Sequence, residues 1–225
     1  MVGYGAAMDA ADSRPATVLL AGATGLVGSH VLALLLADPR VARVVAPARR
    51  PLPPHPKLQD PRVDYDALPA DAPWWAVDAV VCTLGTTIRT AGSREAFRRV
   101  DHDYPLRVAE LALRHGARAY ALNSAKGADP GPRVFYTRTK GERERDRETL
   151  ASPAQTSVRP GLIGGERDEH RSGEAAATVV LRALAPVLPR GWRINPAPVV
   201  AAALVEAALR APAGRHAVES AALLG

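Results

Sequence analysis

Residues 17–28 read Thr-Val-Leu-Leu-Ala-Gly-Ala-Thr-Gly-Leu-Val-Gly, and this stretch decides the fold. Its apolar first part predicts a buried parallel strand, and the apolar spacing that follows predicts a helix. Three glycines between the two have the spacing G-x-x-G-x-x-G. We expect Gly22 to allow the tight strand-to-helix turn, Gly25 to let the backbone approach a pyrophosphate, and Gly28 to let the helix pack on the strand.

The amino end of the helix after this turn is the second part of the argument. It offers unpaired N–H groups and the positive end of the helix dipole, both of which favour a phosphate. The stretch therefore predicts a nucleotide site, made by residues Gly22, Thr24, Gly25, Leu26, Val27 and Gly28. The alternative is a glycine-lined turn that binds no ligand.

Length and composition limit the remaining classes of protein. A chain of 225 residues with 47% hydrophobic and 4% aromatic residues fits one aliphatic α/β domain. One cysteine, Cys82, excludes a disulfide framework, and six scattered histidines lack ligand spacing, so we expect no metal. No apolar run reaches the ~18 residues of a membrane span, and no signal-peptide pattern opens the chain. We expect a loose tail at residues 1–16, a cytoplasmic location and no membrane partner.

The net charge of +6 does not predict a nucleic-acid partner. Basic and acidic residues are interleaved, as in residues 140–148 (Lys-Gly-Glu-Arg-Glu-Arg-Asp-Arg-Glu). Such alternation is typical of a solvated, salt-bridged helix face rather than of a basic stripe.

Strand-like and helix-like segments alternate through most of the chain. Six strands are predicted, at residues 17–21, 41–48, 63–65, 77–84, 119–124 and 156–159. Helices are predicted at residues 104–115, with Asp103 as N-cap and Gly116 as the stop, and at 133–150. The stretch 51–61, with five prolines, is predicted to be loop. The alternation predicts a doubly wound parallel sheet, the Rossmann fold.

The order loosens after Pro160. Residues 161–173 read as a glycine-rich charged loop, followed by helices at roughly 174–184 and 199–210. We expect a small helical C-terminal lobe over about 161–225, within a single domain that spans 17–225. A homodimer is left open, because nothing in the sequence fixes the oligomeric state.

The segment Tyr136-Thr-Arg-Thr-Lys140 carries a second candidate site. On a helix, positions i and i+4 share a face, so the phenol and the ammonium project together. A neighbouring cation favours a phenolate, which makes a general acid/base for a substrate hydroxyl or carbonyl. Lys140 is one of only three lysines in a chain that otherwise uses arginine. The alternative is a surface tyrosine that stacks on a lysine stem.

Ser124 strengthens the catalytic interpretation. It ends the predicted fifth strand, at the sheet edge where doubly wound folds place their functional groups. A hydroxyl there can hold the substrate oxygen while Tyr136 exchanges its proton. The alternative is an N-cap or loop serine.

These motifs resemble the short-chain dehydrogenase/reductase superfamily. The resemblance is stronger to its atypical branch, which includes Tat-interacting-protein-like proteins and bacterial NAD(P)H-binding relatives. It covers residues 17–210 and is carried by Cys82-Thr-Leu-Gly-Thr-Thr87, Val100-Asp-His-Asp-Tyr104, Ser124-Ala-Lys-Gly-Ala-Asp129 and Arg159-Pro-Gly161.

The resemblance implies where a nicotinamide dinucleotide would lie. It places adenine near Asp64 and Tyr65, and the middle of the cofactor near Leu84, Gly85 and Thr86. It also implies that Lys140 binds the nicotinamide ribose, and that Pro160 and Gly161 lie against the nicotinamide. Where the family often has an asparagine in its proton relay, this chain has Asp101.

The residues after the predicted second strand favour NADP over NAD. NAD-binding folds carry an acidic residue about 20 positions past the glycine turn, to hold the ribose 2′-hydroxyl. This chain has Arg49 and Arg50 there, and two guanidiniums suit a 2′-phosphate. The alternative is that Arg50 faces solvent and Arg49 acts alone.

The sequence leaves the reaction itself open. Arg167 and Arg171 could clamp an anionic part of a small-molecule substrate, or could pair with the acidic residues beside them. The leading hypothesis is an NADP(H)-dependent oxidoreductase with Ser124, Tyr136 and Lys140 as catalytic residues. The alternatives are a dinucleotide-binding regulatory or interaction protein without turnover, and an isomerase or epimerase with bound cofactor.

Overall fold

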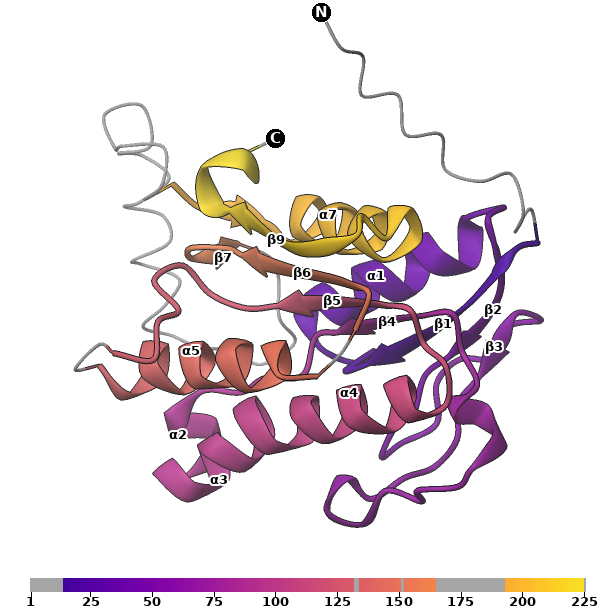
Figure 1. Ribbon diagram of the computed structural model, residues 1–225, viewed down its shortest axis with the longest axis horizontal. Helices are drawn as coiled ribbons and strands as arrows, with labels where there is room; N and C mark the ends of the chain where they lie inside the picture. The colour runs from indigo at the N-terminus through magenta and orange to yellow at the C-terminus, as the bar shows by residue number, and fades with distance from the viewer. Residues whose placement is uncertain (1–13, 132–133, 151, 165–192, 225) are drawn as a thin grey trace, which may run out of the picture.

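The predicted first strand lies near the middle of a seven-stranded parallel sheet in the computed structural model (Figure 1). The structure describes residues 14–131, 134–150, 152–164 and 193–224. The strand order is β3-β2-β1-β4-β5-β6-β9. The strands are β1 (Ala16–Ala21), β2 (Val41–Val45), β3 (Leu58–Gln59), β4 (Ala79–Cys82), β5 (Ala119–Asn123), β6 (Ala154–Arg159) and β9 (Gly214–Glu219). This order confirms the predicted doubly wound fold.

Helices cover both faces of the sheet. On one face α1 (Leu26–Ala37) packs against α7 (Ala197–Arg210), and on the other lie α4 (Tyr104–Arg114) and α5 (Phe135–Glu148) (Figure 1). The short helices α2 (Ile88–Ala91) and α3 (Arg94–Arg98) precede α4. Because alternate strand residues face opposite layers, β1 sends Val18 and Leu20 toward α1 and α7, and Leu19 toward α4. Among the described residues, none of the helices has the length and apolarity needed to span a membrane.

The third strand differs from the prediction. The prediction placed it at residues 63–65, but β3 is Leu58–Gln59, inside the proline-rich stretch 51–61 that was predicted to be loop. Its residues lie between prolines and keep their N–H groups, and the Gln59 carbonyl accepts a backbone hydrogen bond from Ala46 at 2.8 Å. Two paired residues at the sheet edge are compatible with flanking prolines.

The start of α4 also differs from the prediction. Asp103 is not an N-cap, because it has helical dihedrals (φ −71°, ψ −45°) and its side chain makes no capping bond. Instead α3 continues through a π-helical turn, Arg99–Asp103, directly into α4. The predicted stop at Gly116 is confirmed, with φ of +98°. π-Helical turns are rare and are concentrated at functional sites.

The described C-terminal residues complete the sheet. Helix α7 lies on the sheet face, and β9 pairs in parallel with β6 along its whole length. The sequence did not predict β9, because its exposed residues lack the apolar run of a buried strand. The strands β7 (Ile163–Gly164) and β8 (Asn195–Pro196) pair in parallel and form a separate two-stranded sheet. The predicted helix at 174–184 and residues 1–13 of the predicted tail at 1–16 lie outside the described residues, whereas Ala16 is the first residue of β1.

Candidate functional site at the carboxyl edge of the sheet

The glycine turn lies where the strand order reverses, between β1 and β4. Gly22 has φ of +93°, a conformation that other residues rarely adopt. A Cβ on Gly28 would overlap the carbonyl oxygen of Gly22, so the helix contacts the turn as closely as a glycine allows. A Cβ on Gly25 would have no neighbour nearer than 3.5 Å. The side of the turn at Gly25, beside exposed Thr24, is therefore open to a ligand.

The amino end of α1 is available for an anion. Gly25 is its N-cap, no side chain caps it, and its first turn holds no acidic residue. The N–H groups at Leu26 and Val27 therefore have the arrangement that binds phosphate. Thr83, which the sequence analysis did not single out, fixes this turn: its hydroxyl lies 3.1 Å from the carbonyl oxygens of Ala21 and Gly22. These residues fit the pyrophosphate of a dinucleotide.

The residues predicted to surround the adenosine part have different environments. Arg49 and Arg50 are both exposed, beyond β2. Tyr65 is buried, and its hydroxyl donates a hydrogen bond to the carbonyl oxygen of Pro47 at 2.9 Å. Burial raises the pKa of Tyr65 well above its usual value. Asp64 is exposed and accepts a hydrogen bond from the backbone of Asp66 at 3.0 Å. The side chains of Asp64 and the two arginines are therefore exposed to solvent, whereas the Tyr65 side chain is packed in the interior.

A buried ion pair lies at the end of β4. The Lys140 ammonium is 2.6 Å from Asp101, and the side chains are 6% and 0% exposed. The other oxygen of Asp101 accepts a hydrogen bond from the backbone N–H of Thr86 at 2.7 Å. A Cβ on Gly85 would lie 3.3 Å from Asp101 and 3.8 Å from the Lys140 nitrogen. The π-helical turn thus brings Asp101 to the predicted cofactor segment Leu84–Thr86.

Tyr136 and Lys140 share one face of α5, as the spacing predicted. The Lys140 nitrogen lies 5.0 Å from the centroid of the Tyr136 ring. Tyr136 is partly exposed, and its ring packs 5.6 Å from the ring of Phe97 in α3. The phenol is therefore held by an aromatic neighbour and a cation, and part of its surface remains open.

Ser124 contacts a carboxylate that the sequence analysis did not identify. Its hydroxyl donates a hydrogen bond to Glu144 of α5, and both residues are buried. Arg159, at the end of β6, holds Glu144 through Nη2 at 2.5 Å and Nε at 3.1 Å. The hydrogen bonds that Arg159 donates to Glu144, with a smaller contribution from the one to Glu219, raise the pKa of Arg159 further above its usual value. Glu144 lies four residues after Lys140, so helical spacing was the signal that could have identified it.

The segment after β6 is held by Asn195. The backbone N–H of Gly161 donates to the Asn195 side chain at 2.7 Å, and the Pro160 carbonyl accepts from the Lys126 N–H at 2.7 Å. Asn195 is fully buried and also donates to the carbonyl oxygens of Ser220 and Leu223. The predicted substrate residues Arg167 and Arg171 lie outside the described residues.

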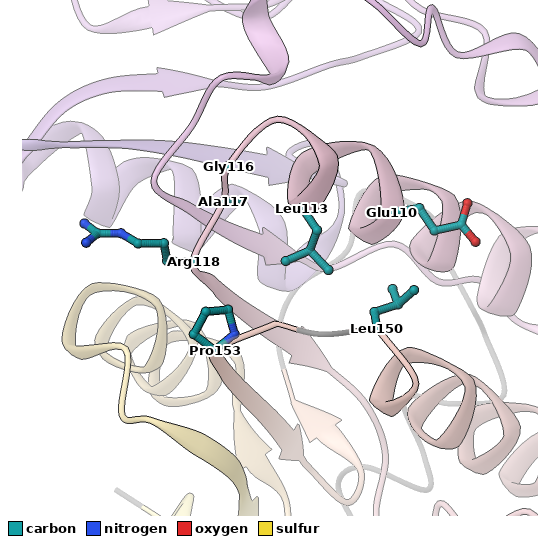
Figure 2. A pocket seen from close by; sticks show the side chains of 7 residues that line it. All are labelled: Glu110, Leu113, Gly116, Ala117, Arg118, Leu150 and Pro153. Atoms are coloured by element: carbon teal, nitrogen blue, oxygen red, sulfur yellow. The ribbon is translucent and has the colours of Figure 1, made fainter.

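A cavity of about 500 Å³ lies away from these residues (Figure 2). It is formed by the C-terminal ends of α4 and α5 and the segments that lead into β5 and β6, with Leu113, Leu150 and Pro153 in its wall. These segments lie at the amino edge of the sheet, whereas Ser124 and the glycine turn lie at the carboxyl edge. None of the predicted site residues lines this cavity.

Comparisons with known proteins agree on the family and the fold. Residues 18–151 match the model of the NAD dependent epimerase/dehydratase family. The chain is 36% identical over 221 residues to "Protein fmp52, mitochondrial" of Emericella nidulans, covering 90% of this chain and 94% of that protein. It is 33% identical over 193 residues to HTATIP2 of Rattus norvegicus, covering 84% and 79%.

Solved structures give the same architecture at lower identity. The structure described as MoeE5 in complex with UDP-glucose and NAD superimposes with a TM-score of 0.68 and 20% identity, covering 89% of this chain and 74% of that one. At this identity the match supports the fold alone.

The comparisons correct the expected location. The sequence-based expectation of a cytoplasmic protein is contradicted by relatives named mitochondrial, which are 35–36% identical over most of the chain. That expectation depended on the lack of a signal-peptide pattern in residues 1–14 and of an apolar run of ~18 residues, neither of which tests for a mitochondrial location.

Proposed function

Because the chain belongs to the NAD dependent epimerase/dehydratase family, we propose that it is an NADP(H)-dependent oxidoreductase of the short-chain class. Its motifs' resemblance to atypical short-chain dehydrogenase/reductases is confirmed by its relatives. The proposed substrate is a small carbonyl compound or the matching alcohol. The observation that carries the proposal is the Tyr136–Lys140 pair beside Gly85, at the carboxyl edge of the sheet.

Three groups of residues would hold the cofactor. Gly22, Gly25 and the amino end of α1 would bind the pyrophosphate. Arg49 and Arg50 would bind a 2′-phosphate, because both guanidiniums are exposed at the end of the second strand. When bound, the nicotinamide ring supplies or accepts the hydride. Lys140 would bind the ribose beside it.

Tyr136 would move the proton. In the reducing direction its phenol donates a proton to the substrate oxygen, and in the oxidising direction its phenolate removes one. The Lys140 ammonium lies over the face of this ring, 5.0 Å from its centroid. Asp101 holds this ammonium in place and offsets the cost of burying it.

Ser124 would position the substrate oxygen. Its hydroxyl hydrogen is directed to Glu144, so it must rotate in order to donate to a substrate. Arg159 makes three hydrogen bonds to Glu144, and one of them, from Nε at 3.2 Å, goes to Oε1, the oxygen that Ser124 contacts. This rotation would therefore not leave a buried carboxylate oxygen without a partner. Glu144 is thus a positioning residue that acts through Ser124.

The proposal is tested by assaying NADPH oxidation with a panel of aldehydes, ketones and quinones, for the wild type and for Tyr136→Phe. We expect the substitution to reduce turnover at least ~100-fold, the usual contribution of a general acid. NADPH affinity should stay within about twofold, because the ring and its packing are kept. Equal turnover in the two proteins would refute the role of Tyr136.

A second candidate function is dinucleotide binding without turnover. It is favoured by one observation: Ser124 and Lys140 are both engaged by buried carboxylates, Glu144 and Asp101. In that case both proteins bind NADPH equally well, and neither oxidises it with any member of the panel.

The preference for NADP is tested separately with Arg49→Ala. We expect NADPH affinity to fall about tenfold or more, because one charge-assisted contact to the 2′-phosphate is removed. NADH affinity should hardly change. Equal weakening of both coenzymes would contradict the proposed role of Arg49.

A further inference from the structure

Two arginines are buried between α5 and the sheet. Arg143 is 1% exposed and Arg147 is 4% exposed. Their i, i+4 spacing puts them on one face of the helix. The Arg147 guanidinium lies 5.6 Å from the ring centroid of Tyr120 in β5, which is buried as well. This layer therefore holds two cations where a Rossmann sheet ordinarily has apolar packing.

Each guanidinium uses only one of its three nitrogens. Nη2 of Arg143 donates to the Asn123 carbonyl at 3.1 Å, and Nη2 of Arg147 donates to the Ser157 hydroxyl at 2.9 Å. The Nε and Nη1 atoms of both residues are buried and have no hydrogen-bond partner among the described residues. Two buried side-chain acceptors of the described residues are also unpartnered: Oε1 of Gln155, which shares this side of β6 with Ser157, and Oδ1 of Asn123. Between α5 and the sheet, the unpartnered N–H donors of the described residues therefore outnumber the unpartnered side-chain acceptors.

The charges are also unbalanced. Glu144 is the nearest buried carboxylate in sequence, and it is engaged by Arg159 and Ser124. Among the described residues neither Arg143 nor Arg147 forms an ion pair. Burial lowers the pKa of Arg147, and the neighbouring Arg143 cation lowers it further, although carboxylates and Tyr120 act in the opposite direction. A buried cation without a counter-charge is strongly unfavourable.

Internal water would correct only part of this imbalance. A water molecule can accept hydrogen bonds from the free N–H groups, but it brings two donors of its own and no negative charge. A ligand that only accepts hydrogen bonds and carries negative charge corrects both deficits. We propose that Arg143 and Arg147 bind a small inorganic anion, of the size and charge of chloride, between α5 and strands β5 and β6.

This site is separate from the proposed reaction. The anion would brace the helix that carries Tyr136, Lys140 and Glu144, and would do so whether or not the protein turns over a substrate. The proposal therefore stands or fails independently of the proposed function.

The first test measures thermal unfolding of the wild type in sodium chloride and in sodium gluconate, at constant ionic strength. Gluconate is too large for an enclosed site. Because a ligand that binds the folded state stabilises it, we expect Tm to rise by about 3–6 °C as chloride replaces ~200 mM gluconate. No dependence on chloride would overturn the proposal, and it is also the result expected if internal water alone solvates the guanidiniums.

The second test uses Arg147→Met with Arg145→Met as the matched control. Arg145 is on the same helix and is 59% exposed, so its substitution should leave the chloride response intact. Arg147→Met should fold, because replacing a buried charge with an apolar group is often neutral or stabilising. We expect it to lose the chloride response, and to lose the broadening of the ³⁵Cl resonance that the wild type produces. A chloride response equal to that of Arg145→Met would overturn the assignment.

Discussion

Helices α1 and α5 both begin at the carboxyl edge of the sheet, but they bury opposite kinds of residue. α1 buries only Val27, Gly28, Val31 and Leu35. α5 buries Thr139, Lys140, Gly141, Arg143, Glu144 and Arg147. The first helix is held by apolar contact and offers only its backbone to a ligand. The second carries the predicted chemistry on side chains that need partners.

The difference shows how stability and function are divided between the helical layer that contains α1 and the one that contains α5. Apolar burial at α1 contributes about 25 cal/mol per Å² without any requirement for pairing. The charged groups of α5 are stabilising only while each partner is present, because desolvation offsets much of the attraction. Substitutions in α5 should therefore have large effects when they remove one member of a pair.

Glu144→Ala should have the largest effect on stability. It leaves the Arg159 guanidinium and the Ser124 hydroxyl without their buried partner, which should lower the free energy of unfolding by about 3–5 kcal/mol. Urea unfolding monitored by circular dichroism measures this change. The matched control is Glu148→Ala on the same helix, where the side chain is 40% exposed and the cost should stay below ~1 kcal/mol. Similar losses in the free energy of unfolding for the two variants would mean that the burial of Glu144 does not determine its contribution to stability.

Gly28→Ala should have the next largest effect, and it tests the apolar helix. The added Cβ would overlap the Gly22 carbonyl and push α1 away from the turn, at a cost of about 1–3 kcal/mol. Gly25→Ala is the control, because its Cβ would have only an ordinary contact of 3.5 Å with the Gly22 carbonyl and its φ of −79° suits any residue. Equal denaturation midpoints for Gly28→Ala and the wild type would contradict the close helix-to-turn contact.

Arg40→Ala should have the smallest effect, because the ion pairs of the α1 layer lie at the surface. Arg40 contacts Asp38 at the end of α1 and Glu206 in α7, and its hydrogen bonds lower the pKa of both carboxyl groups from their usual 3.8 and 4.5. The stability they add is present above the usual values and is lost as pH falls through the lowered ones. We expect a difference of less than ~1 kcal/mol at pH 7 that decreases as pH falls below the usual carboxyl values, measured by urea unfolding across pH.

Local pattern predicted the apolar layer better than the charged one. Some features depend only on neighbours within a few residues, and these could be predicted from the sequence. They are the turn at Gly22–Gly28, the strand before it and the Tyr136–Lys140 spacing. Strand β9 and the contacts of Ser124 with Glu144 depend on pairing between distant segments. No local pattern encodes such pairing, so these features required the three-dimensional structure.

Asp101, which stands where the family often has an asparagine, shows the same limit of prediction from local sequence. Its position in the chain was visible, but its pairing with Lys140 follows from a π-helical turn that replaced a predicted N-cap. Asn195 was not predicted for a similar reason, since it joins Gly161 to Ser220 and Leu223 across three segments.

The most direct test of the central claim is calorimetric titration of NADPH and NADH into the wild type and Gly25→Val. A side chain at Gly25 blocks the open approach to the amino end of α1 without touching the packed residues. We predict that the wild type binds NADPH, and that the variant binds it at least ~10-fold more weakly while its Tm falls by only a few °C, the cost of valine at an N-cap. Equal affinity in the two proteins, or no heat from either coenzyme with the wild type, would contradict a dinucleotide site at this turn.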